Sequence, residues 1–334
     1  MEQRTLISND RGTTSREASV VGLGTWQLGA DWGEVSEADA RDVLASAVEA
    51  GVTFLDTADV YGDGRSEQVI GRFLQEHPGL TVATKMGRRT DQVPENYTLD
   101  NFRAWTDRSR RNLGVDTLDL VQLHCPPSAV IEADRTYDDL DRLVADGAIA
   151  AYGVSVETAD QALAAIRRPH VASIQIILNA FRLKPLDEVL PAAVSAGVGV
   201  IARVPLASGL LSGRYDESTT FSADDHRTYN RDGSAFDVGE TFSGVDFSTG
   251  VRAAQEFSAL VGEAGPTGLT PAQVALAWVW QQPGVTTVIP GARHAGQARA
   301  NAAAGDADPL PQALLDGVTR LYDTHFREAV HGRW

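Results

Sequence analysis

Four polar residues with side chains suited to proton and hydride transfer stand at or just after the ends of apolar runs: Asp56, Tyr61, Lys85 and His124. A phenol is a weak acid, with an ordinary pKa of about 10. A nearby ammonium lowers that pKa, a carboxylate holds the ammonium, and a histidine can donate to a substrate oxygen. The four residues therefore predict a site that reduces a carbonyl, with Tyr61 as the proton donor.

Taken singly, each of these residues also has a structural explanation. Asp56 can cap a turn, Tyr61 can be a half-buried aromatic, Lys85 can be solvated and His124 can be a core histidine. Their joint occurrence at successive strand ends favours the functional explanation. The chain has only two lysines, Lys85 and Lys184, among many arginines. Because the pKa of an amine can be tuned and that of a guanidinium cannot, a lysine at position 85 supports a chemical role.

The elements that must position these residues follow from periodicity. Apolar, β-branched runs alternate with segments of helical period, which is typical of parallel βαβ units. The runs cover residues 20–25, 53–56, 82–85, 118–124, 151–155, 173–177, 198–202 and 286–290. Eight of them predict an α/β fold, a (β/α)8 TIM barrel with long βα loops, and we expect residues 1–334 to form this single barrel domain. The carboxyl ends of its strands converge on one face, which predicts a shared pocket.

Three further segments complete the expected fold. A helix is predicted over residues 36–50, with Ser36 as its cap and Gly51 after its end. Strand-like residues around 4–7 predict an N-terminal β-hairpin that closes the barrel floor. Residues 215–246 are polar and without helical or strand period, which is typical of a lid, a binding loop or local disorder.

The composition excludes several classes of function. The chain has 334 residues, of which 43% are hydrophobic, and a net charge of -16, which argues against nucleic acid or an anionic membrane as a partner. It has no long apolar run and no signal-peptide pattern at its start, so we expect a soluble, cytoplasmic protein. Cys125 is the only cysteine, which excludes an intrachain disulfide and a thiolate metal cluster. We interpret it as a small buried residue and predict no metal site.

Several motifs occur in a fixed order along the chain. They are Gly22-Leu23-Gly24-Thr25-Trp26, residues 51–58 with Tyr61, Glu67 and Gly71, Thr84-Lys85, Leu123-His124, Gly153-Val154-Ser155, residues 205–213 and residues 289–293. Over nearly the whole chain this order resembles the aldo-keto reductases, and the long loop resembles their bacterial branch of general aldehyde and ketone reductases. The resemblance implies a nicotinamide cofactor held without a Rossmann domain. It also implies catalytic roles for Asp56, Tyr61, Lys85 and His124.

The cofactor contacts are predicted in two places. In the Gly/Ser-rich stretch 205–214, backbone N–H groups and the hydroxyls of Ser208 and Ser212 can cradle a pyrophosphate. Arg293, Gln297 and Asn301 recur at spacing four, so a helix beginning around Arg293 would place them on one face. The resemblance makes Arg293 a candidate for the 2′-phosphate, which favours NADPH/NADP+ over NADH, and the other two candidates for the adenosine end.

The complete prediction covers both ligands. The cofactor-binding residues are Gly24, Thr25, Trp26, Asp56, Ser155, Gln175, Arg203, Pro205, Leu206, Ser208, Gly209, Leu210, Ser212, Gly213, Arg214, Gly291, Arg293, Gln297 and Asn301. The substrate residues are Trp26, Trp32, Tyr61, Arg88 and His124. The partner is a small-molecule carbonyl or alcohol, and both a monomer and a small homo-oligomer fit the sequence.

The sequence departs from the family pattern at two positions. Relatives often have asparagine after the serine that corresponds to Ser155, but here Val156 follows it. One hydrogen bond to the nicotinamide carboxamide is then missing, which leaves Ser155 and Gln175 to hold it. Other branches place an aromatic residue where Arg203 stands. A guanidinium can stack on the ring, but its charge opposes the cationic oxidised form, so we hypothesise that Arg203 tilts binding toward NADPH.

These observations favour an NADPH-dependent oxidoreductase that converts aldehydes or ketones to alcohols by hydride transfer. Two alternatives stay open. One is a cofactor-binding regulatory subunit with little turnover, as in the potassium-channel β subunits that resemble this family. The other is a barrel enzyme that uses Lys85 as a Schiff-base nucleophile, which would leave Asp56, Tyr61 and the phosphate-facing residues without a role.

Overall fold

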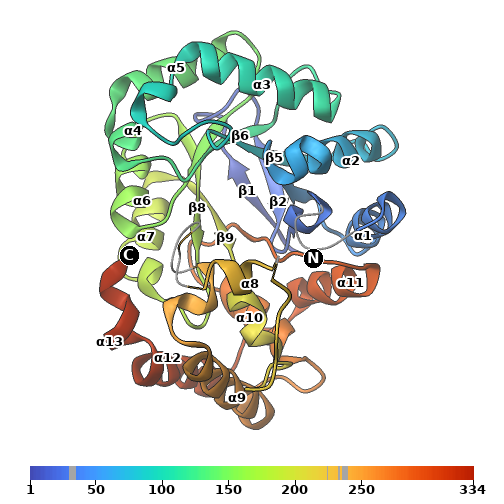
Figure 1. Cartoon of the computed structure of the whole chain (residues 1–334), viewed down its shortest axis with the longest axis vertical. Coiled ribbons are helices and arrows are strands. Elements are labelled where there is room, and N and C mark those ends of the chain that lie inside the picture. The colour runs from blue at the N-terminus through green and yellow to red at the C-terminus, as the bar shows by residue number, and fades with distance from the viewer. Residues whose placement is uncertain (30–34, 224, 232–233, 235–239) are drawn as a thin grey trace.

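Eight parallel strands form the centre of the molecule. The computed structural model describes residues 1–29, 35–223, 225–231, 234 and 240–334, and its main sheet runs in chain order from β3 to β10 (Figure 1). The strands are β3 (Leu23–Gly24), β4 (Phe54–Asp56), β5 (Thr81–Met86), β6 (Leu120–His124), β7 (Tyr152–Ser155), β8 (Val171–Ile177), β9 (Gly199–Arg203) and β10 (Thr287–Val288). The Gly22 N–H donates to the Val288 carbonyl over 2.8 Å, and Gly24 pairs with Gly291, so the two edges meet. The predicted (β/α)8 barrel is confirmed.

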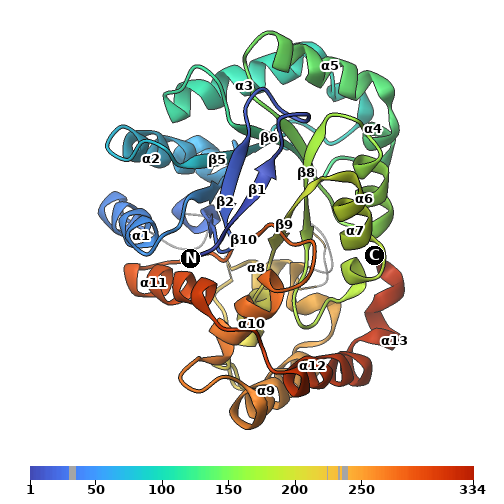
Figure 2. The same ribbon diagram turned by 180° about the vertical axis from the view of Figure 1, so that it is seen from behind.

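Helices follow the strands and cover the outside of the barrel (Figures 1 and 2). They are α1 (Glu37–Glu49), α2 (Arg65–Leu74), α3 (Leu99–Leu113), α4 (Ser128–Glu132), α5 (Asp134–Ala145), α6 (Ala159–Ile166), α7 (Val189–Ala196), α8 (His226–Tyr229), α9 (Phe247–Ala264), α10 (Pro271–Trp280), α11 (Ala295–Ala303), α12 (Gln312–His325) and α13 (Arg327–Val330). Short 3-10 helices are η1 (Trp26–Gly29), η2 (Tyr61–Gly64), η3 (Pro94–Asn96), η4 (Lys184–Leu186), η5 (Ala207–Ser212), η7 (Phe242–Gly244), η8 (Ala304–Asp306) and η9 (His331–Arg333). No described helix combines the length and the apolar character that crossing a bilayer requires.

The helix starts follow from their capping residues. The Ser36 hydroxyl accepts the Asp39 N–H over 3.1 Å, so α1 begins where the sequence predicts. For α11 the prediction was wrong by two residues. The cap is His294, whose Nδ1 accepts the Gln297 N–H over 3.3 Å, so the helix begins at Ala295 and Arg293 precedes it.

The predicted N-terminal hairpin is present. Strands β1 (Gln3–Ile7) and β2 (Arg16–Ser19) pair antiparallel and lie across the amino-terminal end of the barrel, in front of it in Figure 2. Leu6 and Ile7 of β1 are buried in one apolar cluster with residues of the barrel strands, among them Phe54, Leu120 and Ile201. The hairpin thus forms an apolar floor, and any ligand must enter from the opposite end.

The polar segment 215–246 is more regular in its described part than its sequence indicates. It contains α8 and η7, and the rings of Phe221, Phe242 and Phe247 pack together, with centroids of the last two 5.0 Å apart. Phe242 is fully buried. Phe221 contacts two rings that lie more than 20 positions later in the chain, and contacts of this kind produce no helical or strand period in the sequence.

Candidate active site

A cavity of about 740 Å³ opens at the carboxyl ends of the barrel strands, which is within the usual size range of small-molecule sites. Residues from most strand ends line it, from Asp56, which ends β4, to Arg293 after β10. Strand register brings part of this lining together, because His124 pairs with Ser155 and Ser155 with Gln175 across three neighbouring strands.

Asp56, Lys85 and Tyr61 form a hydrogen-bonded chain at the floor of the cavity. The Lys85 ammonium pairs with the Asp56 carboxylate, donates to the Thr57 carbonyl over 2.8 Å and lies 3.4 Å from the Tyr61 hydroxyl. The Lys85 and Asp56 side chains are 1% and 3% exposed, so this ion pair is shielded from water. A buried pair with extra hydrogen bonds holds its two charges in a defined geometry.

Two glutamines complete the surroundings of Asp56. Gln175 Nε2 donates to Asp56 Oδ2 over 2.8 Å and Gln122 Nε2 donates to the same oxygen over 3.2 Å. Gln175, which was predicted to contact the cofactor, thus donates one of its amide hydrogens to the Asp56 carboxylate. Its carbonyl oxygen can still accept a hydrogen bond from a carboxamide N–H. Gln122 was not predicted, although it lies two positions before His124 in β6 and therefore points to the same face of the strand, opposite Lys85.

The electrostatics of Tyr61 differ from the prediction. Removal from water raises the pKa of the phenol, and although Lys85 lowers it, the net pKa is above the ordinary value. The predicted lowering by the ammonium is therefore real but smaller than the effect of burial. Tyr61 consequently keeps its proton at neutral pH, which is the state that a proton donor needs.

His124 is neutral in this site. Burial, together with the nearby charges of Arg88, Lys85 and Arg203, holds the pKa of the imidazole well below its usual range. Its Nδ1 is buried and has no hydrogen-bond partner among the described residues, which favours the tautomer with the proton on Nε2. The His124 ring meets the Tyr61 ring edge-on at 6.0 Å, so the two side chains lie close enough to act on one oxygen.

Close backbone packing places Tyr61. The Trp26 ring stacks on the Tyr61 ring with centroids 6.0 Å apart. Gly62 has a φ of 57°, and a Cβ there would lie 2.0 Å from the Gly29 carbonyl oxygen. Only glycine allows η1 and η2 to approach in this way, so Gly62 fixes the position of the tyrosine before it.

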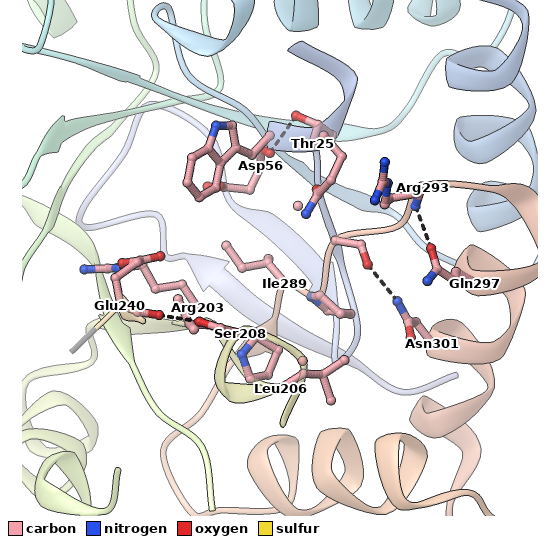
Figure 3. A pocket seen from close by; sticks show the side chains of 18 of the residues that line it. Thr25, Asp56, Arg203, Leu206, Ser208, Glu240, Ile289, Arg293, Gln297 and Asn301 are labelled. Atoms are coloured by element: carbon pink, nitrogen blue, oxygen red, sulfur yellow. Dashed lines mark hydrogen bonds and ion pairs between the residues drawn. The ribbon is translucent and has the colours of Figure 1, made fainter. Parts of the chain in front are cut away.

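The predicted adenosine end lies on the opposite side of the cavity from Arg203 (Figure 3). The Gln297 amide oxygen accepts the Arg293 N–H over 2.8 Å, and Asn301 Nδ2 donates to the Gly291 carbonyl over 3.1 Å. The three side chains of the predicted set line one wall although Arg293 precedes the helix. Arg293 itself is exposed, as a group that binds a phosphate at an open end would be.

The Gly/Ser loop has an unusual backbone. Ala207, Ser208 and Gly209 have φ values of 48°, 57° and 94°, so consecutive residues adopt the left-handed conformation. The Ser208 and Ser212 hydroxyls each donate over 2.6 Å to backbone carbonyls, of Glu240 and Gly209 respectively. A hydroxyl with its proton engaged must release that partner before it can donate to a phosphate, so the predicted cradle relies first on backbone N–H groups.

Most of the predicted residues line the cavity, and the exceptions have clear reasons. Lys85 is buried beneath the cavity surface, where its ammonium lies 3.4 Å from the Tyr61 hydroxyl that lines the cavity. Leu210 is fully buried and packs beside Gly250 of α9, and Gly213 is the C-cap of η5, so neither of these two predicted contacts faces the cavity. Trp32 lies outside the described residues. Cys125 was wrongly interpreted as a buried residue, since it is partly exposed and lines the cavity.

Several residues that line the cavity were not predicted from the sequence, above all Glu240. Its carboxylate pairs with the Arg203 guanidinium, and the two side chains are 14% and 12% exposed. The sequence before Glu240 is polar and has no helical or strand period. Nothing in it indicated that Glu240 lines the cavity. This pairing changes the hypothesis about Arg203. The positive charge of its guanidinium was expected to oppose the oxidised cofactor, but the negative charge of the Glu240 carboxylate lies beside it.

A second carboxyl group near the site was also missed. Asp59, in the loop between β4 and η2, is fully buried, and no side chain among the described residues hydrogen-bonds to its carboxyl oxygens. Burial, with the charge of Glu67, raises the pKa of Asp59 to about 7, against the opposing effect of Arg89 and Arg108. Asp59 therefore changes charge near neutral pH.

Comparison with known proteins identifies this arrangement. The model of the Aldo/keto reductase family matches residues 20–323. The chain belongs to the aldo/keto reductase family. Among its relatives in that family, the aldo-keto reductase YhdN of Bacillus subtilis (strain 168) is 28% identical over 295 residues, which are 86% of this chain and 85% of that protein.

Solved structures of aldo/keto reductases share the fold. A glycerol dehydrogenase of Gluconobacter oxydans superposes with a TM-score of 0.76, is 29% identical and is covered over 93% of both chains. An aldo-keto reductase of Klebsiella pneumoniae, solved in complex with NADPH, superposes with a TM-score of 0.70 at 24% identity over 96% of both chains. The fold of this chain is therefore that of these solved reductases.

Proposed function

We propose that this aldo/keto reductase uses NADPH to reduce aldehydes or ketones to alcohols, with Tyr61 as the proton donor. The observation that carries the proposal is the chain from Asp56 through Lys85 to Tyr61, which ends beside the neutral His124 in a cavity open to a ligand. This combination presents one acid and one neutral donor to the same point, as the protonation of a carbonyl oxygen requires.

The residues of the cavity fit a dinucleotide phosphate. The volume of the cavity suits a molecule of that size, and Arg214 and Arg293 are among the basic residues that line it. The Ser155 hydroxyl and the Gln175 carbonyl oxygen offer polar contacts near His124 for a carboxamide. Arg293 can pair with a phosphate dianion, which supports NADPH over NADH. The Klebsiella relative that was solved with NADPH has the same fold and supports this choice of cofactor.

Each residue then has a definite task. When bound, the cofactor supplies the hydride. Tyr61 gives its proton to the substrate oxygen, and the Lys85 ammonium stabilises the phenolate that remains. Asp56 keeps the ammonium in place, and His124 donates a hydrogen bond to the same oxygen. The substrate carbonyl is thereby polarised and oriented before it reacts.

The contacts of Lys85 argue against the Schiff-base alternative. Burial alone would lower the pKa of the amine, but Asp56 and Tyr61 outweigh it and raise the pKa above its ordinary value. An amine that is protonated at neutral pH is a poor nucleophile. The ion pair with Asp56 would also have to break before Lys85 could attack a carbonyl.

The experiment is NADPH oxidation, followed by absorbance, with a panel of aldehydes and ketones for wild type and Tyr61→Phe. Tyr137→Phe is the matched control, since it removes a buried hydroxyl that bonds to the Ile131 carbonyl outside the cavity. We expect Tyr61→Phe to lose at least about 100-fold in kcat while NADPH affinity is kept, and Tyr137→Phe to retain kcat. Tight NADPH binding by wild type without turnover of any substrate would favour the regulatory alternative instead.

A further inference from the structure

The ion pair between Arg203 and Glu240 stands at the reacting end of the cavity. Arg203 ends β9, and its guanidinium also donates to the Val156 carbonyl over 3.3 Å. Glu240 comes from the polar segment and is anchored by its own carbonyl, which accepts the Ser208 hydroxyl over 2.6 Å. Figure 3 shows Glu240, Arg203 and Ser208 together at one side of the cavity. Two separate contacts therefore hold the carboxylate and the guanidinium against each other.

Both charges act on the residues that contact the substrate oxygen. Glu240 is among the groups that, after burial, raise the pKa of Tyr61, and Arg203 is among those that lower the pKa of His124. A hydride donor must lie within about 3.5 Å of the carbonyl carbon whose oxygen meets Tyr61 and His124. The nicotinamide ring, which carries a positive charge only when oxidised, must therefore lie in the field of these two charges.

We propose that Glu240 is a specificity-determining residue for the oxidation state of the cofactor. Its carboxylate cancels the charge of Arg203 at the ring, so that the protein holds NADPH and NADP+ with similar affinity. Without Glu240, the guanidinium would repel the cationic ring and favour NADPH. Without Arg203, the carboxylate would attract the cationic ring and favour NADP+. The inference rests on the proposed NADP(H) dependence and concerns a property of the same site.

The two opposite signs make the experiment decisive. Dissociation constants of NADPH and NADP+ are measured by fluorescence titration and calorimetry, without substrate, for wild type, Glu240→Gln, Arg203→Gln and the double variant. At an effective dielectric constant of about 20, unit charges even about 10 Å apart interact by more than the 1.4 kcal/mol that a ten-fold change requires. We expect the ratio of the NADP+ constant to the NADPH constant to rise about ten-fold in Glu240→Gln and to fall about ten-fold in Arg203→Gln.

In the double variant, the ratio should return to within about three-fold of wild type. A ten-fold change in this ratio corresponds to about 30 mV in the potential of the bound two-electron couple, which redox titration of the bound cofactor can measure independently. Glu76→Gln is the matched control, because Glu76 pairs with Arg41 on the surface, away from the cavity, with both side chains more than half exposed. Thermal unfolding of each variant establishes that it is folded.

The possible outcomes separate the two proposals. Opposite shifts in the single variants, cancelled in the double variant and absent from Glu76→Gln, would establish the inference. Ratios that stay within two-fold of wild type, or that shift in the same direction in Arg203→Gln and Glu240→Gln, would overturn it while NADPH dependence stands. Failure of wild type to bind either form of the cofactor would instead overturn the proposed function.

Discussion

Replacement of the buried Asp59 by asparagine should make the protein more stable at alkaline pH. The pKa of this carboxyl is about 7 in the folded protein and close to the ordinary 3.8 in the unfolded chain. Below pH 3.8 both states are protonated and Asp59 costs nothing. As the pH rises toward 7, the unfolded chain releases the proton while the folded protein retains it, so the folded state loses stability. Above pH 7 the loss is complete.

The size of the effect follows from the two pKa values. At 1.36 kcal/mol per pKa unit, the full loss is about 4 kcal/mol, and about 2 kcal/mol of it falls between pH 5.5 and pH 8. Asparagine at position 59 has no charge to bury and escapes this term. We therefore expect the unfolding free energy of Asp59→Asn, relative to wild type, to increase by about 2 kcal/mol between those two pH values.

Urea unfolding followed by circular dichroism at pH 5.5 and pH 8 tests this expectation. Comparison of the two proteins at each pH removes the contribution of all other titrating groups that they share. The control is Asp42→Asn in α1, which makes the same substitution at an exposed position. If Asp59→Asn differs from wild type by the same amount at both pH values, the assignment of a buried, neutral carboxyl is refuted.

Three further predictions concern the site. Gly62→Ala should destabilise the protein by at least about 2 kcal/mol in thermal unfolding. The control is Gly114→Ala, which should lower the stability by about 1 kcal/mol. Gly114 also has a positive φ, but a Cβ there would have nothing within 4 Å. Arg293→Ala should weaken NADPH at least about ten-fold in fluorescence titration and leave NADH unchanged; equal losses for both would contradict a 2′-phosphate contact. Lys85→Met should lower the unfolding free energy by about 3–5 kcal/mol, because it leaves the buried Asp56 charge uncompensated, and a stability within about 1 kcal/mol of wild type would contradict this.

The barrel and its catalytic strand ends were predictable because their signals are local. The run 82–85 lies within β5 (Thr81–Met86), and the run 53–56 ends with β4 at Asp56. β-branched composition identifies such buried strands, and parallel connection then brings their carboxyl ends together. No knowledge of distant contacts is needed to place Asp56, Lys85 and His124 on one face.

Positions that depend on contacts between distant residues were not predictable. The start of α11 depends on whether His294 caps the helix, and a histidine is not among the preferred caps. Glu240 pairs with Arg203 across 37 positions of the chain. Such a contact leaves no periodic trace, so the sequence identified Arg203 and not the group that neutralises it.

Asp56 and Asp59 show the same division within a short stretch of chain. Asp56 ends β4 and was predicted as a site residue, whereas Asp59, three positions later in the following loop, carries no local signal of its environment. Asp56 meets an ammonium and two amide donors, so its charge is compensated, whereas Asp59 has no comparable side-chain donors among the described residues and retains its proton up to about pH 7. Tyr61 lies two positions further along the chain, so the carboxyl whose ionisation destabilises the folded protein as the pH rises stands beside the predicted proton donor. We therefore expect the pH dependence of stability to arise beside the site rather than in the apolar floor.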